Sequence, residues 1–205
     1  MTPMLADYGM HATTVVYVTR VAGPLGVLHV ASVEAGVCAL AFDACAQGLE
    51  PRLRRAFGPF FRVEDGDPVG IARRIARYFA GELRALDDVP LAAPATPMQR
   101  RVWSLVRDVA PGDVTTYASI AQRLGMPRAQ RAVGVCLASN PVPMLVPCHR
   151  VIAASGSLGS HPGGVAVKGA LLRHEGARFT WPRRARRRTR PDDTVDLVAF
   201  PLALG

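Results

Sequence analysis

The sequence predicts an α+β fold in two parts, a small antiparallel sheet with helices followed by a helical domain. Residues 13–42 hold β-branched and apolar runs separated by glycine turns. Residues 97–138 show apolar side chains at helical spacing. A segment with three prolines, 87–97, separates the two patterns and reads as a linker. We therefore expect an N-terminal domain over 1–92, a C-terminal domain over 93–176 and a tail over 177–205.

The composition describes a globular protein. The chain has 205 residues, of which 49% are hydrophobic and 20% charged, so disordered and fibrous classes are excluded. No run approaches the roughly 20 apolar residues that span a membrane, and the N-terminus lacks a secretory-signal pattern. Four scattered cysteines do not make a disulfide framework. We expect a soluble cytoplasmic protein with reduced thiols and no membrane association.

Positive charge is concentrated in the second half of the chain. The formal charge is +9, yet residues 1–92 carry 9 basic and 10 acidic side chains, whereas residues 93–176 carry 9 and 3. Such an excess favours a surface for a polyanion such as nucleic acid, although a solubilising face is the alternative. The tail over 177–205 is also basic and is expected to be flexible; its arginines either add non-specific DNA affinity or are simply solvated.

The N-terminal part is expected to begin with three strands. The runs at 13–19, 27–32 and 37–42 are separated by glycine-containing turns, which predicts three consecutive antiparallel strands. Apolar residues then recur at helical spacing over 49–57 and 69–85, with arginines opposite the second stripe. Two helices packed against the sheet follow from this pattern.

The C-terminal part is expected to be helical and to contain a helix-turn-helix. Thr96 and Pro97 predict an N-cap and first helical position. After that helix, a short helix over 117–124 stops at Gly125, and another runs over 127–138. Two short helices joined by a tight turn match the DNA-binding pattern, but many other helical pairs share it. Small residues on the second helix suit either a groove or a closely packed neighbour.

Cys148 is the candidate nucleophile. A free thiol with a pKa of about 8.5 is only slightly ionised at neutral pH, so a nucleophilic cysteine needs a base within reach. His149 is adjacent in sequence, and Glu175 is the only acidic residue between Asp113 and Asp192. A Cys/His/Glu relay is one interpretation of these residues. The alternative is a small buried thiol, which is what most cysteines are.

The chain around Cys148 carries a series of motifs that together resemble a known family. They are Asn140-Pro141-Val142-Pro143, Pro147-Cys148-His149-Arg150-Val151, Ser155-Gly156-Ser157-Leu158-Gly159, Gly163-Gly164, Lys168, Leu171-Leu172 and His174-Glu175-Gly176. In this order they resemble the methylated-DNA–protein-cysteine methyltransferases, or O6-alkylguanine-DNA alkyltransferases. The resemblance is dense over 97–176 and looser over 13–92.

The resemblance implies DNA repair by direct reversal. The family moves an alkyl group from guanine O6 in duplex DNA to one of its own cysteines, once per molecule and without a cofactor; activity on O4-alkylthymine stays open. It further implies a ribonuclease H-like N-terminal sheet, a winged-helix-like C-terminal domain and a monomer. The partner is double-stranded DNA containing an alkylated guanine, whose nucleotide is flipped out of the helix. The enzyme class is methylated-DNA–[protein]-cysteine S-methyltransferase.

The resemblance also assigns roles to individual residues. Cys148 is the acceptor, His149 takes its proton through a water, and Glu175 orients the imidazole. Tyr117 contacts the flipped nucleotide at guanine N3, and Asn140 ties the recognition helix to the active-site strand. Arg131 fills the space left by the flipped base. The remaining DNA-binding residues are Arg128, Ala132, Gly134, Thr116 and Tyr117, and the pocket residues are Met144, Val151, Ser160, His161 and Pro162.

The chain departs from the family pattern in the loop expected to close over the substrate. His161 stands where a tyrosine is usual, and a histidine is smaller and can titrate. Pro162 is expected to stiffen this lid enough to exclude bulky groups such as benzyl. Arg150 is expected to fix the local turn through backbone hydrogen bonds.

The sequence disfavours a metal site and two other classes of function. Some family members hold zinc, but no C-x2-C or H-x3-H spacing links the candidate ligands, so no metal is expected. A non-catalytic lesion-binding relative would lack the acceptor, so Cys148 argues against it. A helix-turn-helix regulator would need base-specific contacts, which the small residues of this recognition helix offer sparingly. The candidate ligands are His11, His29, Cys38 and Cys45.

Overall fold

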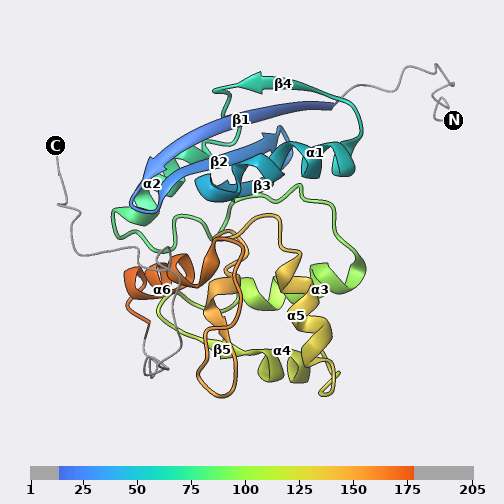
Figure 1. Cartoon of the computed structure of the whole chain (residues 1–205), viewed down its shortest axis with the longest axis vertical. Coiled ribbons are helices and arrows are strands. Elements are labelled where there is room, and N and C mark those ends of the chain that lie inside the picture. Colours follow the sequence, from blue (N-terminus) through green and yellow to red (C-terminus); the bar gives the residue numbers. More distant parts are fainter. Residues whose placement is uncertain (1–13, 178–205) are drawn as a thin grey trace, which may run out of the picture.

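The computed structural model describes residues 14–177, which form an α+β fold (Figure 1). A twisted sheet with two flanking helices occupies one end of the molecule, and the C-terminal helices lie beneath it. Among the described residues, no helix has the length and apolar character needed to cross a membrane. The predicted flexible tail lies outside the described residues, apart from Ala177.

The sheet contains the three predicted antiparallel strands and one strand more. The strands β1 (Thr14–Gly23), β2 (Gly26–Val33) and β3 (Gly36–Phe42) form an antiparallel meander, as predicted. Strand β4 (Phe60–Glu64) pairs parallel to β1, which gives the order β3-β2-β1-β4. The prediction of three strands was therefore incomplete. The β4 segment lies at the sheet edge with almost every side chain exposed, so it lacks the alternation that marks a half-buried strand.

The two faces of the sheet pack against different partners. On one face, Val16 and Val18 pack against Leu49 and Leu53 of α1 (Leu49–Phe57), which follows a 3-10 helix, η1 (Asp43–Gly48). The other face packs against α2 (Ile71–Phe79) and joins a core that continues into the C-terminal helices. Burial of this continuous apolar surface fixes the two halves against each other.

The proline-rich linker runs along the edge of β3. The Val37 N–H donates to the Pro90 carbonyl (2.9 Å), and the Ala92 N–H donates to the Val37 carbonyl (2.9 Å). Gly36 makes this approach possible, because a Cβ atom there would lie 2.5 Å from the Pro90 oxygen. The domain boundary near residue 92 stays a prediction, since the linker is held to the sheet and the core is continuous.

The C-terminal half contains the predicted helix-turn-helix. Helix α3 (Pro97–Arg107) begins at a capping box between Thr96 and Gln99. The pair itself is α4 (Tyr117–Arg123) and α5 (Gln130–Ala138), and α5 starts later than predicted because 126–129 form a turn. The remaining elements are β5 (Thr115–Thr116), a 3-10 helix η2 (Cys148–Arg150), β6 (Val151–Ile152), which pairs parallel to β5, and α6 (Gly164–His174).

Candidate active site

Cys148 lies in the wall of a cavity beside the helix-turn-helix. The cavity measures about 170 Å³ and opens between α4, α5 and the loop before α6. Cys148 is only 5% exposed, so its contact with solvent is confined to this cavity. The lining residues are Tyr117, Gly134, Leu137, Ala138, Cys148, Ser160, His161 and Pro162.

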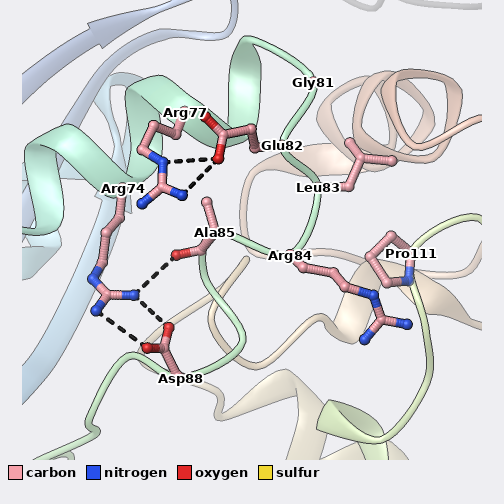
Figure 2. A pocket seen from close by; sticks show the side chains of 9 residues that line it. All are labelled: Arg74, Arg77, Gly81, Glu82, Leu83, Arg84, Ala85, Asp88 and Pro111. Carbon is pink, nitrogen blue, oxygen red and sulfur yellow. Dashed lines mark hydrogen bonds and ion pairs between the residues drawn. The ribbon is translucent and has the colours of Figure 1, made fainter.

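A larger hollow on the surface carries no comparable chemistry. It measures about 610 Å³ and lies beside α2 and the loop that follows it (Figure 2). Two of its three arginines are bonded within the hollow itself, since Arg77 donates to Glu82 (2.6 Å) and Arg74 donates to Asp88. No cysteine, serine or histidine is among its lining residues. The cavity at Cys148 is therefore the candidate site.

Asn140 holds the backbone that carries Cys148. Its Nδ2 donates to the Val146 carbonyl (2.9 Å) and to Cys148 Sγ (3.4 Å), while its Oδ1 accepts from the Val142 N–H (3.0 Å). The chain before Cys148 is a turn, with Met144 at φ +73°, and not the active-site strand that the resemblance implied. Asn140 thus joins the end of α5 to the cysteine through a turn.

His149 and Glu175 form the predicted pair. His149 Nε2 lies 3.0 Å from Glu175 Oε1, and both side chains are buried. An ionised carboxylate only accepts hydrogen bonds, so the ring carries its hydrogen on Nε2 and keeps a lone pair on Nδ1. That Nδ1 is buried and has no hydrogen-bond partner among the described residues. Burial lowers the pKa of His149 against the opposing effect of Glu175, which leaves a neutral ring able to accept a proton.

Two further side chains bind the same carboxylate. Arg150 donates from Nε to Glu175 Oε2 (2.9 Å) and from Nη2 to Oε1 (2.8 Å), and Tyr78 OH donates to Oε1 (2.8 Å). Burial raises the pKa of Glu175, but hydrogen bonds from His149 and Arg150 outweigh it and leave the pKa below its usual range. Arg150 also donates to the Val109 carbonyl (2.6 Å), so the expected backbone bonding is only part of its role.

Lys168 is a site residue to which sequence reasoning gave no function. It is the only lysine in the chain, it is fully buried, and its Nζ donates to the Val151 carbonyl (2.6 Å). Burial raises the pKa of Cys148, and the Asn140 hydrogen bond and the Lys168 charge oppose this. Burial in turn lowers the pKa of Lys168 to about 8. The signal that could have found it is a lone lysine amid apolar residues in α6.

The loop over the cavity is supported by the N-terminal half. His161 Nδ1 accepts from the Gly163 N–H (3.1 Å), and its ring lies 5.9 Å from the Phe42 ring. Cys45 Sγ donates to the Pro162 carbonyl (3.4 Å). Burial lowers the pKa of His161 to about 3, so this histidine stays neutral at physiological pH.

The predicted DNA-binding residues lie on the outer face of the helix pair. Arg128, Arg131 and Ala132 are exposed, whereas Gly134 faces the cavity. Thr116 caps α4 by accepting from the Ser119 N–H (3.1 Å). Arg131 therefore lies exposed on α5, the helix that contributes Gly134 to the cavity wall.

Two predicted pocket residues are not in the pocket. Val151 is fully buried in the core, and Met144 faces a separate small cavity beside Tyr78 and Arg150. The resemblance assigned both residues to the pocket, but Val151 packs in the core and Met144 lies in a turn, with φ +73°. Leu137 and Ala138 of α5 line the cavity with the predicted Tyr117, Ser160, His161 and Pro162.

The candidate zinc ligands do not converge. Among residues 14–177, no three side chains of His, Cys, Asp or Glu come together in a way that could hold a metal ion. Cys38 donates to the Ala31 carbonyl (3.2 Å), and burial raises its pKa to about 12, which disfavours the thiolate that zinc needs. His11 lies outside the described residues.

Family models match both halves of the chain. Residues 16–93 match the 6-O-methylguanine DNA methyltransferase, ribonuclease-like domain, and residues 97–177 match the 6-O-methylguanine DNA methyltransferase, DNA binding domain. A methylated-DNA–protein-cysteine methyltransferase of Shigella flexneri is 44% identical over 115 residues, which is 56% of this chain and 67% of the relative. One from Haemophilus influenzae is 31% identical over 164 residues, which is 79% of this chain and 87% of the relative.

Solved structures agree with the sequence matches. Mycobacterium tuberculosis OGT in complex with DNA aligns with a TM-score of 0.63 at 32% identity, covering 78% of this chain and 92% of that one. The O6-methylguanine methyltransferase of the same organism aligns with a TM-score of 0.67 at 34% identity, covering 80% and 95%. The two alignments cover about four fifths of this chain. The chain therefore belongs to the 6-O-methylguanine DNA methyltransferase family.

Proposed function

We propose that this protein repairs DNA by moving an alkyl group from O6 of a flipped guanine to Cys148 Sγ, once per molecule. The enzyme class and DNA binding follow from the family. The alkylated guanine as partner, the monomeric state and the residue roles are our proposal. One observation carries it: a cysteine faces a cavity beside a helix-turn-helix, and its neighbour in the chain, His149, is hydrogen-bonded to Glu175.

The proton of the thiol leaves before or as the sulfur attacks. His149 Nδ1 holds the lone pair that takes this proton through a bridging water, and Glu175 stabilises the imidazolium that results. Lys168 and the Asn140 amide oppose the desolvation of the sulfur, which favours the thiolate. The base is therefore neutral before the reaction and charged after it.

Attack of the thiolate on the alkyl carbon forms the C–S bond and breaks the O6–C bond. The bonding electrons leave with the guanine as an anion, which a hydrogen-bond donor stabilises until the base takes up a proton. Burial raises the pKa of Tyr117, so its phenol stays protonated and can donate to guanine N3. The product thioether is not converted back to a thiol, so each protein molecule reacts once.

The position of the cavity requires the target base to leave the helix. Cys148 is buried behind α5, so a guanine stacked in duplex DNA cannot reach it, and extrusion costs a few kcal/mol. The exposed Arg131 on α5 is suited to enter the stack and pair with the orphaned base. Ala132 beside it and Gly134 behind it let the helix lie close to the minor groove.

The function is tested by following the methyl group. Incubation with duplex DNA containing one O6-methylguanine should add one methyl mass to the peptide that carries Cys148. The number of lesions repaired per protein molecule should reach one and not exceed it. Unmodified duplex is the control. Transfer to Cys38, Cys45 or Cys136, or turnover of several lesions per molecule, would contradict the proposal. Light scattering during gel filtration checks the monomer.

Arg131→Ala should slow repair of duplex DNA by about 10- to 100-fold, because the variant loses part of the few kcal/mol that offset base extrusion. Single-turnover transfer at saturating DNA measures this. Arg52→Ala removes the same charge from the exposed face of α1 and should leave the rate unchanged. An Arg131→Ala variant that repairs duplex DNA at the rate of the parent would rule out the role in flipping.

The lid should make the site selective for small alkyl groups. The cavity of about 170 Å³ is bounded by Pro162 and His161, so a benzyl adduct should react about 10-fold or more slowly than a methyl adduct. Pro162→Ala should bring the rates for methyl and benzyl adducts closer together, because the loop can then move. Competition between the two adducts in one reaction measures the ratio, and Pro51→Ala, at an exposed position of α1, serves as the control. Equal rates for methyl and benzyl would contradict a restrictive lid.

A further inference from the structure

We infer that Tyr78, a residue of the N-terminal half, is a positioning residue for the reaction, because its hydroxyl holds the carboxylate that orients the histidine base. Sequence reasoning placed Tyr78 in the apolar stripe of α2, where an aromatic side chain needs only to fill space. The inference rests on the proposed function, since it concerns the His149–Glu175 pair used there.

The contact joins two segments that are distant in sequence. Tyr78 OH donates to Glu175 Oε1 over 2.8 Å, across a separation of 97 residues. Both residues are buried, Tyr78 at 1% and Glu175 at 4% exposure. The backbone is fixed as well, because His174 Nε2 lies 2.9 Å from the Tyr78 carbonyl and the two rings are 5.0 Å apart. Burial and the contacts with His174 therefore fix the position from which the Tyr78 hydroxyl donates to the carboxylate.

The hydroxyl acts on the same oxygen as the histidine. Glu175 Oε1 accepts from Tyr78 (2.8 Å), from Arg150 Nη2 (2.8 Å) and from His149 Nε2 (3.0 Å), whereas Oε2 accepts from Arg150 Nε. Three donors around one oxygen leave the carboxylate little freedom to rotate. Burial, reinforced by the Glu175 charge, raises the pKa of Tyr78, so this phenol remains a donor throughout the working pH range.

A phenylalanine would fill the same space, so the hydroxyl needs its own explanation. A buried hydroxyl that donates to a carboxylate withdraws negative charge from the oxygen that binds the ring. Without it, Oε1 would be a stronger acceptor for His149 and would favour the imidazolium before the reaction begins. The same loss would let the carboxylate turn away from the ring. Both effects reduce the fraction of protein with a neutral, correctly placed base.

Removal of the Tyr78 hydroxyl leaves the other charged and titratable groups around His149 in place. They are Glu175 and Arg150, which bond one another, Lys168 from α6, His161 from the lid and Cys148 itself. Burial lowers the pKa of His149, and Arg150 and Lys168 act in the same direction. Removal of the Tyr78 hydroxyl changes only the one opposing influence, the charge that Glu175 presents.

The test is the Tyr78→Phe variant in single-turnover transfer from an O6-methylguanine duplex between pH 5.5 and 8.5. The rate at pH 7 should fall about 10- to 100-fold, as expected for loss of one hydrogen bond to a charged group, and the acid limb of the profile should move to higher pH. Phe79→Leu is the matched control. Phe79 contacts His174 at the same interface but makes no hydrogen bond to Glu175, so it should change thermal stability without moving the acid limb.

A double-variant cycle separates coupling from general loosening. In a Glu175→Gln background, Tyr78→Phe should have little further effect on the rate, because the carboxylate through which it acts is gone. All rates are measured below the melting transition of each variant, at 10 °C if necessary. Additive effects in the cycle, or a Tyr78→Phe variant with the parent rate and acid limb, would overturn the inference. A parent protein that transfers no methyl group would instead refute the proposed function.

Discussion

Replacing Cys148 with serine should abolish alkyl transfer and leave DNA binding intact. The reaction needs a nucleophile that ionises near neutral pH, and a serine hydroxyl beside a single imidazole remains protonated; the rate should fall by roughly 1000-fold or more. The serine fits the same space and can accept the Asn140 hydrogen bond that Sγ accepts now (3.4 Å). Mass spectrometry after incubation with O6-methylguanine duplex should show no methylated peptide, while fluorescence anisotropy reports unchanged affinity.

Cys45→Ser is the control for this experiment. Cys45 is the other cysteine near the cavity, since its Sγ donates to the Pro162 carbonyl, and it is exposed. Its replacement should leave transfer at the parent rate, because it has no base beside it. A Cys148→Ser variant that still becomes methylated would show that another thiol is the acceptor, and the Cys45→Ser result would identify or exclude the nearest one.

The sequence predicted most of the chemistry because the reacting residues lie close together in it. Cys148 and His149 are neighbours, and Glu175 was the only acid available between them and the tail. The structure places His149 Nε2 3.0 Å from Glu175 Oε1 and Asn140 Nδ2 3.4 Å from Cys148 Sγ, and the roles of these residues in the reaction stay predictions. The meander of three strands was equally accessible, since alternating burial and glycine turns are local properties.

What the sequence could not predict depends on contacts between distant segments. Tyr78 lies in an amphipathic helix with Ile71 and Ile75, and a pattern cannot distinguish a tyrosine that only fills space from one that donates to Glu175. Strand β4 was missed because edge strands with exposed side chains have no burial pattern. The resemblance assigned Met144 and Val151 to the pocket, but neither lines the cavity at Cys148, and Val151 is fully buried in the core.

Glu175→Ala should destabilise the protein as well as slow the reaction. The variant leaves the guanidinium of Arg150, which is 3% exposed, without its anion, and it removes the acceptor of Tyr78. Breaking one partner of a buried ion pair costs about 3–5 kcal/mol, which corresponds to a melting temperature roughly 10 °C lower in a protein of this size. Transfer should slow about 100-fold or more, because His149 loses the group that fixes its tautomer and stabilises its charged form.

The pH dependence of stability tests whether the negative charge of Glu175 is what stabilises the folded protein relative to Glu175→Ala. The folded protein holds the pKa of Glu175 below the value of about 4.3 expected for an unfolded chain. Its stabilising contribution is therefore complete above pH 5 and is lost as pH falls toward the folded-state pKa. Urea denaturation should show a large gap between parent and Glu175→Ala at pH 7 that narrows below pH 4. Glu175→Gln, which keeps the shape without the charge, should follow the same trend, and a gap that stays constant into acid would mean that packing, and not the carboxylate, holds this part of the core together.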